Sequence, residues 1–464
     1  MISINPSIFR EYDIRGIAGK DISRDFAEHL GLAYAEYAYS KLKKESLTIT
    51  LGRDCRLTSD DYAEGLTEGL TRGGIHVIKI GVCPSPLTYF SVHRYQTDGA
   101  IMITGSHNPA EYNGFKIGIE KDTLHGEQIQ EIKNLMLAGK FTERKRGSVK
   151  EAEIIPSYLE YVANQIKPER RLKVVLDSGN GTASTVAPEL FRAIGAEVIE
   201  LYCELDGRFP NHHPDPTVPA NLSDLVAAVQ KHGADFGVGF DGDADRIGAV
   251  DETGRILYGD ELMVIFARDV LRKHPGATII SEVKSSNRLY QDIEKNGGHG
   301  IMWKTGHSLI KSKMKETKAL LAGEMSGHIF FADQWFGFDD AIYSAVRLYE
   351  IVGRNRTLSN LIADLKPVMN TPEIRIDCEE SQKFALIEEA AKLLKDPEAK
   401  LTTIDGLRVD YEDRWGLIRA SNTQPVIVMR FEAQSAALLK EIRSKFEAAL
   451  QAAAEKLGHE KFQF

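Results

Sequence analysis

Three aspartates stand at every second position in the segment FGVGFDGDADR (236–246): Asp241, Asp243 and Asp245. Carboxylates this close together repel one another, so they are usually stable only with a cation between them. Oxygen ligands favour a hard ion, with Mg²⁺ the first expectation and Mn²⁺ a substitute. The segment therefore predicts a metal site directly after an apolar stretch.

Two other interpretations of this segment stay open, an acidic surface turn and a calcium loop. Counting from Asp241 places acids at positions 1, 3, 5 and 12, the last being Glu252. However, Arg246 occupies position 6, where a calcium loop needs Gly, and strands instead of helices are expected on both sides. We rank a catalytic Mg²⁺ site first, calcium second and the plain turn last.

Ser106 lies between Gly105 and His107 in TGSHNP (104–109). By itself this is compatible with an ordinary turn or helix cap. The G-x-S-x-G pattern of serine hydrolases is missing, whereas a phosphate carrier fits better. A phosphoserine carries about −1.5 to −2 charges at neutral pH, which a nearby Mg²⁺ offsets. Lys116, in the following NGFKIG, is a candidate to neutralise the same phosphate.

Glu324, Ser326 and His328 stand at every second position in GEMSGH (323–328). Donor and acceptor groups at this spacing suit the vicinal hydroxyls of a sugar, although the motif alone is weak evidence. The nearby WKTGHS segment adds Lys304 and His307, and His307 taken alone favours a structural role.

The segment RASNTQP (419–425) combines a guanidinium, two hydroxyls and an amide. Such a set, with exposed backbone N–H groups, forms an anion pocket in which Arg makes bidentate contacts. A polar hairpin turn explains the segment equally well when it is taken alone.

These segments sit in a regular alternation of apolar strand-like and helix-like stretches. Residues 24–42 show helical spacing after a cap at Ser23. Apolar stretches run into polar clusters near 99–109, 236–246 and 319–328. Open α/β sheets bind ligands beyond the carboxyl ends of their strands, so we expect the candidate residues there, on mostly parallel sheets.

After about residue 366 the pattern changes to short strands with tight turns and a final helix from Ser435 to about Leu457. The expected fold class is α/β, with three similar mixed-sheet α/β domains and a C-terminal α+β domain. We expect their ranges to be 1–150, 151–251, 252–366 and 367–464, which carry the Ser106, aspartate, Glu324 and Arg419 segments in turn. The 464 residues agree with this, since a domain usually has ~100–150 residues.

The composition, with 42% hydrophobic and 27% charged residues, is that of a globular protein. A net charge of −9 and the lack of a basic block argue against nucleic acid or an anionic membrane as partner. We find no apolar run near the ~18 residues of a membrane span and no signal-peptide pattern. Four widely spaced cysteines are typical of a reduced, cytoplasmic protein.

Five motifs, FREYDIRG, TGSHNP, DGDADR, GEMSGH and RASNT, occur in this order along the chain. In this respect the whole sequence resembles the α-D-phosphohexomutase superfamily, specifically its bacterial phosphomannomutase/phosphoglucomutase branch. The resemblance implies four domains around a central active-site cleft. It also implies that hexose 1-phosphate and hexose 6-phosphate, of mannose and of glucose, interconvert through a phosphoserine and a bound 1,6-bisphosphate. A hexose 1,6-bisphosphate would be the activator that primes the enzyme.

The resemblance implies roles for individual residues. Ser106 would be the phosphoserine, and one of its oxygens would bind Mg²⁺ together with Asp241, Asp243 and Asp245. The remaining catalytic residues would be His107, Lys116, Arg246, Arg15 and His307, and the substrate-binding residues would be Tyr12, Lys284, Glu324, Ser326, His328, Arg419, Ser421, Asn422 and Thr423.

Two alternative functions accompany this expectation. A phosphoglucosamine mutase typically has Gln after the Glu of its sugar loop and an S-G-T-E-P phosphate loop, whereas this chain has Met325 and SNTQP. A calcium- or sugar-binding protein without catalysis is the alternative from another class. Phosphosugars are the expected partners, and the resemblance implies a monomer.

Overall fold

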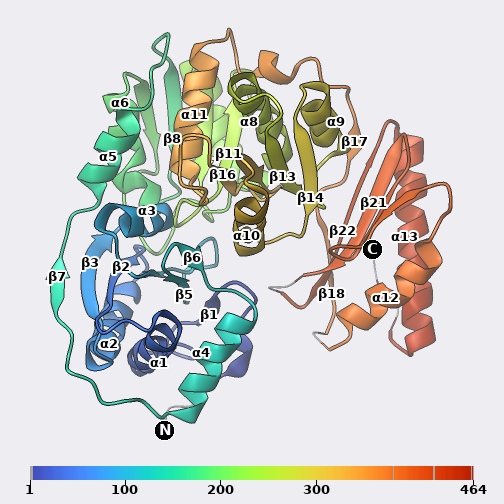
Figure 1. The fold of residues 1–464 in the computed structure, drawn as a ribbon. Helices are drawn as coiled ribbons and strands as arrows, with labels where there is room; N and C mark the ends of the chain where they lie inside the picture. Colours follow the sequence, from blue (N-terminus) through green and yellow to red (C-terminus); the bar gives the residue numbers. More distant parts are fainter. Residues whose placement is uncertain (1–3, 380, 422–423, 461, 463–464) are drawn as a thin grey trace.

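The computed structural model describes residues 4–379, 381–421, 424–460 and 462. Four β-sheets follow one another along the chain, each with its own helices (Figure 1). We number the four sheet-containing units from the N-terminus.

The first unit has a mixed sheet in the order β1-β5-β4-β2-β3-β7, with β6 paired to β5. Its strands are β1 (Ile14–Ile17), β2 (Thr48–Arg53), β3 (His76–Val82), β4 (Ala100–Ile103), β5 (Tyr112–Ile119), β6 (Asp122–Thr123) and β7 (Val149–Glu151). Its helices are the short η1 (Pro6–Ile8), α1 (Arg24–Leu42), α2 (Ser59–Arg72), α3 (Ser85–Tyr95) and α4 (Glu127–Ala138). The expected cap of α1 is confirmed, because Ser23 Oγ accepts a hydrogen bond from Phe26 N at 3.1 Å.

The second and third units repeat the mixed α/β architecture, with sheet orders β12-β11-β10-β8-β9 and β14-β13-β15-β16. The second unit contains α5 (Ile155–Ala163), β8 (Lys173–Asp177), η2 (Thr182–Thr185), α6 (Ala187–Ala193), β9 (Glu197–Leu201), η3 (Pro219–Leu222), α7 (Ser223–His232), β10 (Phe236–Phe240), β11 (Ile247–Asp251) and β12 (Ile256–Leu257). The third contains α8 (Gly259–Lys273), β13 (Thr278–Glu282), α9 (Asn287–Lys295), β14 (His299–Trp303), α10 (His307–Thr317), β15 (Leu321–Gly323), β16 (Ile329–Phe331), α11 (Ala341–Gly353) and η4 (Ser359–Ile362).

The fourth unit has an antiparallel sheet in the order β17-β22-β21-β20-β19, with β18 also paired to β22. It contains β17 (Met369–Asn370), β18 (Ile374–Asp377), α12 (Lys383–Leu394), β19 (Lys400–Thr402), β20 (Leu407–Asp410), β21 (Arg414–Ala420), β22 (Val426–Ala433) and α13 (Ala436–Leu457). The expected final helix is confirmed, and Ser435 caps it by accepting from Leu438 N at 3.4 Å.

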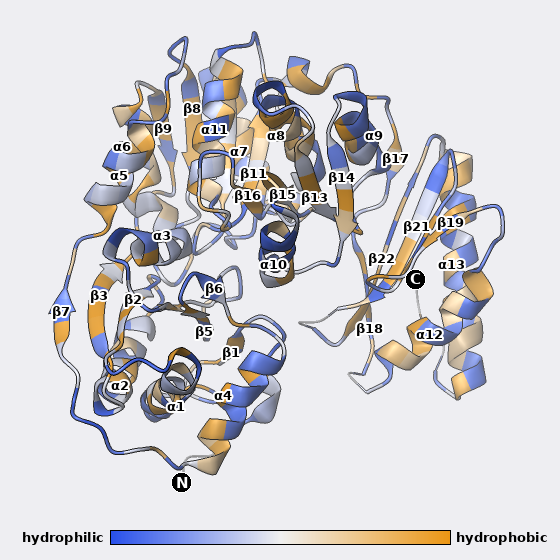
Figure 2. Ribbon diagram, in the orientation of Figure 1, coloured by the Kyte–Doolittle hydropathy of each residue, from blue (hydrophilic) through white to orange (hydrophobic). Residues whose placement is uncertain are grey.

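The hydrophobic cores show how the units are joined. One core runs through the second and third units and reaches β3 and α3 of the first. The fourth unit has a separate core, and a small cluster of Val283, Trp415 and Leu417 connects it to the third. Figure 1 accordingly shows the fourth unit at one end of an arc of four, and Figure 2 shows the hydrophobic residues concentrated on the strands, with α10 largely hydrophilic.

The expected fold class is confirmed: three mixed-sheet α/β units precede an antiparallel α+β unit. The first three sheets are less uniformly parallel than the strand–helix alternation suggests, because each ends in antiparallel strands. The domain boundaries expected from the sequence stay predictions. Within the described ranges, no helix has both the length and the apolar character of a membrane span.

Candidate active site

Each unit contributes one candidate loop, and each loop connects two adjacent antiparallel strands. They are the serine loop (104–111, between β4 and β5), the aspartate loop (241–246, between β10 and β11), the glutamate loop (324–328, between β15 and β16) and the C-terminal loop (421–425, between β21 and β22). The four loops thus occupy equivalent places in their sheets. The sequences of the units are too dissimilar to reveal this correspondence.

Ser106 and the aspartate loop are in direct contact. Ser106 Oγ donates a hydrogen bond to Asp241 Oδ2 at 3.0 Å and lies 3.1 Å from His107 Nδ1. Gly242 allows this approach, because a Cβ atom there would lie 2.5 Å from the carbonyl oxygen of Ser106. The tertiary structure therefore brings together two motifs that are 135 residues apart in the sequence.

The three aspartates form a fully buried cluster whose oxygens can meet at one point. Asp241, Asp243 and Asp245 each offer an oxygen within 4.8 Å of the others. Among the described residues, Asp243 Oδ1 and Asp245 Oδ1 have no hydrogen-bond partner. Unpartnered buried carboxylate oxygens are costly unless a cation neutralises them, so this donor set fits a hard divalent ion.

Lys116 from β5 also enters the aspartate cluster. Its ammonium donates to Asp243 Oδ2 at 2.5 Å and to Asp245 Oδ2. Burial alone would lower the pKa of Lys116, but these carboxylates outweigh burial and raise that pKa well above its ordinary value. Burial and the repulsion of its two neighbours raise the pKa of Asp241. A positive charge inside the cluster is therefore part of its electrostatic balance.

His307 and His328 lie beside the cluster as a stacked pair with ring centroids 5.5 Å apart. Asp339 faces both rings, with Oδ2 lying 3.5 Å from His307 Nδ1 and 3.3 Å from His328 Nδ1. Burial lowers the pKa of His307 well below its usual range, which favours the neutral imidazole. Arg246 Nε donates to His328 Nε2 at 3.1 Å, which joins the aspartate and glutamate loops.

Glu324 is buried in the glutamate loop, and its Oε1 accepts a hydrogen bond from Gly306 N at 2.7 Å. Burial raises the pKa of this carboxyl group. Tyr12 Oη donates to the carbonyl oxygen of Thr305 at 2.8 Å, and Ser326 is half-buried in the glutamate loop. The Tyr12 and Glu324 segments therefore converge on the turn at 305–306.

Arg419 and Lys284 connect the third and fourth units at the same place. Arg419 Nε donates to Asp405 Oδ2 at 3.0 Å, and the same oxygen accepts from Thr305 N at 3.0 Å. Lys284 Nζ donates to Glu373 Oε2 at 3.1 Å. These contacts place two cationic side chains beside the Tyr12 and Glu324 segments.

The remaining expected residues lie in the serine and C-terminal loops or beside them. Arg15 donates to Asn108 Oδ1 at 2.7 Å, and Ser421 Oγ accepts from Gln424 N at 3.1 Å. Asn422 and Thr423 lie outside the described residues. Burial, followed by the nearby Arg246 and Arg15, lowers the pKa of His107 well below its usual value.

Several residues that organise these loops were missed by the sequence analysis. Glu282, at the end of β13, accepts from Met325 N through Oε1 at 3.1 Å and from Lys284 N through Oε2 at 2.9 Å. Arg56 contacts the serine loop and Asp339 contacts the histidines. The polar residues DCR after the apolar stretch at 47–53 were a usable signal for Arg56, whereas no local signal marks Asp339 or Glu282.

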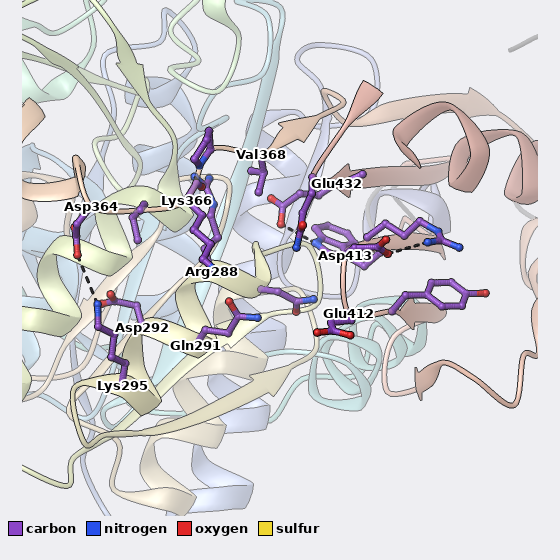
Figure 3. A pocket seen from close by; sticks show the side chains of 18 residues that line it. Arg288, Gln291, Asp292, Lys295, Asp364, Lys366, Val368, Glu412, Asp413 and Glu432 are labelled. Carbon is purple, nitrogen blue, oxygen red and sulfur yellow. Dashed lines mark hydrogen bonds and ion pairs between the residues drawn. The ribbon is translucent and has the colours of Figure 1, made fainter. Parts of the chain in front are cut away.

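A separate cavity of about 560 Å³ lies between α9, the segment 364–368 and the β20–β21 turn (Figure 3). Arg288, Glu432 and Trp415 line it, and none of the residues expected in the active site does. The cavity therefore belongs to the junction of the third and fourth units and not to the candidate active site.

Comparison with protein-family models matches most of the chain. Four models of the phosphoglucomutase/phosphomannomutase family match: α/β/α domain I at residues 6–143, domain II at 156–254, domain III at 258–368 and the C-terminal domain at 373–449.

Individual relatives are similar over almost the whole chain. A phosphomannomutase/phosphoglucomutase of Pseudomonas putida is 48% identical over 445 residues, which are 96% of this chain and 95% of the relative. A phosphoglucomutase of Neisseria gonorrhoeae is 45% identical over 454 residues, 97% of this chain and 98% of the relative. The crystal structure of a phosphoglucomutase/phosphomannomutase family protein from Burkholderia thailandensis superposes with a TM-score of 0.93 at 41% identity, covering 100% of both chains. The resemblance found in the sequence is confirmed, and the chain belongs to the phosphoglucomutase/phosphomannomutase family of the phosphohexomutase superfamily.

Proposed function

We propose that the protein is an isomerase that interconverts the 1-phosphate and the 6-phosphate of mannose and of glucose through a phosphorylated Ser106. The observation that carries this proposal is the 3.0 Å hydrogen bond from Ser106 Oγ to Asp241 inside the buried aspartate cluster. It joins the candidate phosphate carrier to the candidate metal site in a chain of this family.

In the proposed reaction the phosphoryl group moves from Ser106 to the free hydroxyl of a hexose phosphate. The P–Oγ bond breaks and Ser106 Oγ, the leaving group, takes up a proton and becomes a hydroxyl. A P–O bond to the sugar forms, and the proton of the attacking hydroxyl passes to a base of the site, for which the imidazole of His307 is the candidate. The resulting hexose 1,6-bisphosphate turns over in the site. Its other phosphoryl group then returns to Ser106, and the isomeric monophosphate leaves.

The aspartate cluster is the proposed Mg²⁺ site, with Asp241, Asp243, Asp245 and an oxygen of phosphorylated Ser106 as ligands. Bound there, Mg²⁺ would supply compensation for the negative charge on the transferring group. Lys116 adds positive charge from within the cluster, and we propose that His107, Arg15 and Arg246 orient and neutralise the groups around the serine loop.

In this proposal the substrate is held mainly by residues of the third and fourth units, together with Tyr12 of the first. Arg419 and Ser421, with Asn422 and Thr423 of the same loop, bind the phosphate that does not react. The sugar and its surroundings contact Tyr12, Lys284, Glu324, Ser326 and His328. Burial of Ser106 and of the aspartate cluster would keep water away from the phosphoserine, which would otherwise be hydrolysed.

We also propose a hexose 1,6-bisphosphate as activator, because an unphosphorylated Ser106 has to be loaded before the first turnover. We propose a cytoplasmic monomer as well. Among the described residues, Cys55, Cys83 and Cys203 form no disulfide, which supports a reducing compartment. The family resemblance supports the monomer.

The test is a paired assay of the purified protein on mannose 1-phosphate, glucose 1-phosphate and glucosamine 6-phosphate, with catalytic amounts of glucose 1,6-bisphosphate. Turnover of the first two is the expected result, and turnover of only the third would establish the glucosamine alternative. Intact mass after bisphosphate treatment tests the non-catalytic alternative. A chain that never gains a phosphoryl group, with no turnover of any substrate, overturns the proposal.

A further inference from the structure

Arg56 lies beneath the serine loop with its guanidinium fully buried. Its Nη1 donates to the carbonyl oxygens of Pro109 at 2.5 Å and Tyr112 at 2.9 Å. Its Nη2 donates to the carbonyl oxygens of Ser106 at 2.8 Å and Asn108 at 2.6 Å. One side chain therefore binds four main-chain acceptors within seven residues, and this segment includes Ser106.

The fifth donor completes the coordination of this guanidinium. Arg56 Nε donates to Asp54 Oδ2 at 3.1 Å, and the same oxygen accepts from Gly105 N at 3.2 Å. Asp54 therefore neutralises Arg56 and binds the first residues of the serine loop at the same time. All the N–H donors of this buried guanidinium are therefore used. This arrangement is specific to arginine, because only a planar, forked guanidinium reaches several acceptors at once.

Ser106 is held in a conformation that needs such support. Its φ of 48° lies in the left-handed region, which L-residues other than Asn and Asp rarely adopt unless the surroundings hold them there. Besides the bond from Arg56 to its carbonyl oxygen, Ser106 N donates to Thr104 Oγ1 at 2.8 Å. In this conformation the Oγ atom reaches Asp241.

The guanidinium is enclosed by two further contacts. A Cβ atom on Gly105 would lie 2.5 Å from Arg56 Cζ, so glycine permits the loop to lie directly on the guanidinium. The ring centroid of Phe209, from the second unit, lies 5.1 Å from Arg56 Cζ. Arg56 thus lies between the first and second units, and the same two units supply Ser106 and the aspartate cluster.

We infer that Arg56 is a positioning residue for phosphoryl transfer: it holds the main chain of the serine loop so that Ser106 Oγ faces the aspartate cluster. This inference rests on the proposed role of Ser106. Within the described part of the chain, Arg56 makes no hydrogen bond or ion pair with the three aspartates, so its effect on Ser106 passes through the four carbonyl groups. A displacement of about 1 Å at a reacting group is enough to slow a reaction by roughly 10²-fold.

The test compares Arg56→Lys with Arg347→Lys. Both arginines are fully buried and ion-paired, but the hydrogen bonds of Arg347 go to Asp333, Tyr343 and Asp269 in the third unit and, among the described residues, to none of the four loops. For Arg56→Lys we expect a kcat roughly 10²-fold lower and a KM for mannose 1-phosphate changed by less than about threefold, because the Arg419 region is unaltered. The rate at which Ser106 gains a phosphoryl group from glucose 1,6-bisphosphate, followed by intact mass, falls in parallel. For Arg347→Lys we expect both kcat and the rate of Ser106 phosphorylation to stay at the values of the unaltered protein.

A second variant, Gly105→Ala, keeps Arg56 and displaces the loop from it, and the same kcat loss at unchanged KM is expected. This variant tests the positioning role of Arg56 if Arg56→Lys does not fold. The inference is overturned if the folded Arg56 or Gly105 variant keeps the full kcat, if only KM changes, or if Arg347→Lys loses kcat equally. An unaltered chain that never gains a phosphoryl group overturns the proposed function, which distinguishes the two failures.

Discussion

The ammonium of Lys116 lies 2.5 Å from Asp243 Oδ2, although the two residues are 127 positions apart and belong to different units. It also donates to Asp245, so it contacts two of the three carboxylates that form the candidate metal site. A divalent ion bound in this cluster would therefore share two carboxylate groups with a lysine, and the charge of Lys116 in the first unit would be coupled to metal binding in the second.

Replacing Lys116 separates these two roles. In Lys116→Met we expect kcat to fall by roughly 10²–10³-fold, because a cation that offsets developing phosphate charge is lost. We expect the affinity of the unphosphorylated chain for Mg²⁺ or Mn²⁺ to stay equal or increase, because the ammonium no longer competes for Asp243 and Asp245. Titration calorimetry measures this affinity, with Lys315→Met at the exposed pair with Asp122 as the control. Weaker metal binding in Lys116→Met would contradict the prediction.

The aspartate cluster predicts that a divalent ion stabilises the folded protein. An ion that binds only the folded state at 100 times its Kd adds about 2.7 kcal/mol to the free energy of unfolding. We expect Mg²⁺ to raise the melting temperature of the unaltered protein by a few degrees and to leave that of Asp243→Asn unchanged. Asp122→Asn, at the exposed Lys315 pair, is the control and should respond like the unaltered chain. An equal response of Asp243→Asn would place the ion elsewhere.

The proposed role of Arg419 predicts an effect on substrate binding that is separable from the effect on kcat. Arg419→Lys removes the planar guanidinium proposed to bind the phosphate that does not react, so we expect KM for both hexose 1-phosphates to rise about tenfold, equivalent to about 1.4 kcal/mol, with a smaller change in kcat. Steady-state kinetics measures this split. Arg414→Lys, which alters an arginine of the same strand paired with Asp413 and Glu441, should keep KM. A loss confined to kcat would exclude the proposed role of Arg419 in phosphate binding.

The environment of Asp340 predicts that the free energy of unfolding depends on pH. Asp340 is buried at the N-terminus of α11, where Oδ1 accepts from Tyr343 N at 2.8 Å and Oδ2 accepts from Tyr158 Oη at 2.8 Å. Burial raises the pKa of Asp340 from 3.8 to about 7. The folded state then binds the proton more tightly than the unfolded state, so this group's contribution to stability decreases as the pH rises from about 4 to about 7.

The variant Asp340→Asn tests this dependence, because Asn keeps an oxygen that can cap Tyr343 N and has no titrating group. Between pH 5 and pH 8, the free energy of unfolding of the unaltered protein should fall by roughly 2–3 kcal/mol more than that of the variant. Denaturant unfolding at the two pH values measures the difference. Parallel curves for the two proteins would show that Asp340 ionises normally.

Much of the fold and of the candidate site was predictable from local sequence. The cap at Ser23, the final helix from Ser435 and the change of architecture after residue 366 each depend on side chains close together in the chain. The Asp241–Asp245 cluster was predictable for the same reason, since its spacing alone brings carboxylates together. The antiparallel sheet of the fourth unit was predicted, whereas the antiparallel pairs that flank the first three loops were not. The strand–helix alternation indicated mostly parallel sheets there, and strand pairing depends on tertiary context.

The sequence by itself determined which segments carry reactive groups, because polar residues that follow a buried strand leave the core at the edge of a sheet and are recognisable locally. Only the tertiary structure decided how these groups meet: Ser106 on Asp241, Lys116 in the aspartate cluster, and Arg56 beneath the serine loop. The physical reason is that each contact joins surfaces of separately packed segments. Strand order and the packing of units against one another set those distances, and neither is encoded in the spacing of residues within a motif.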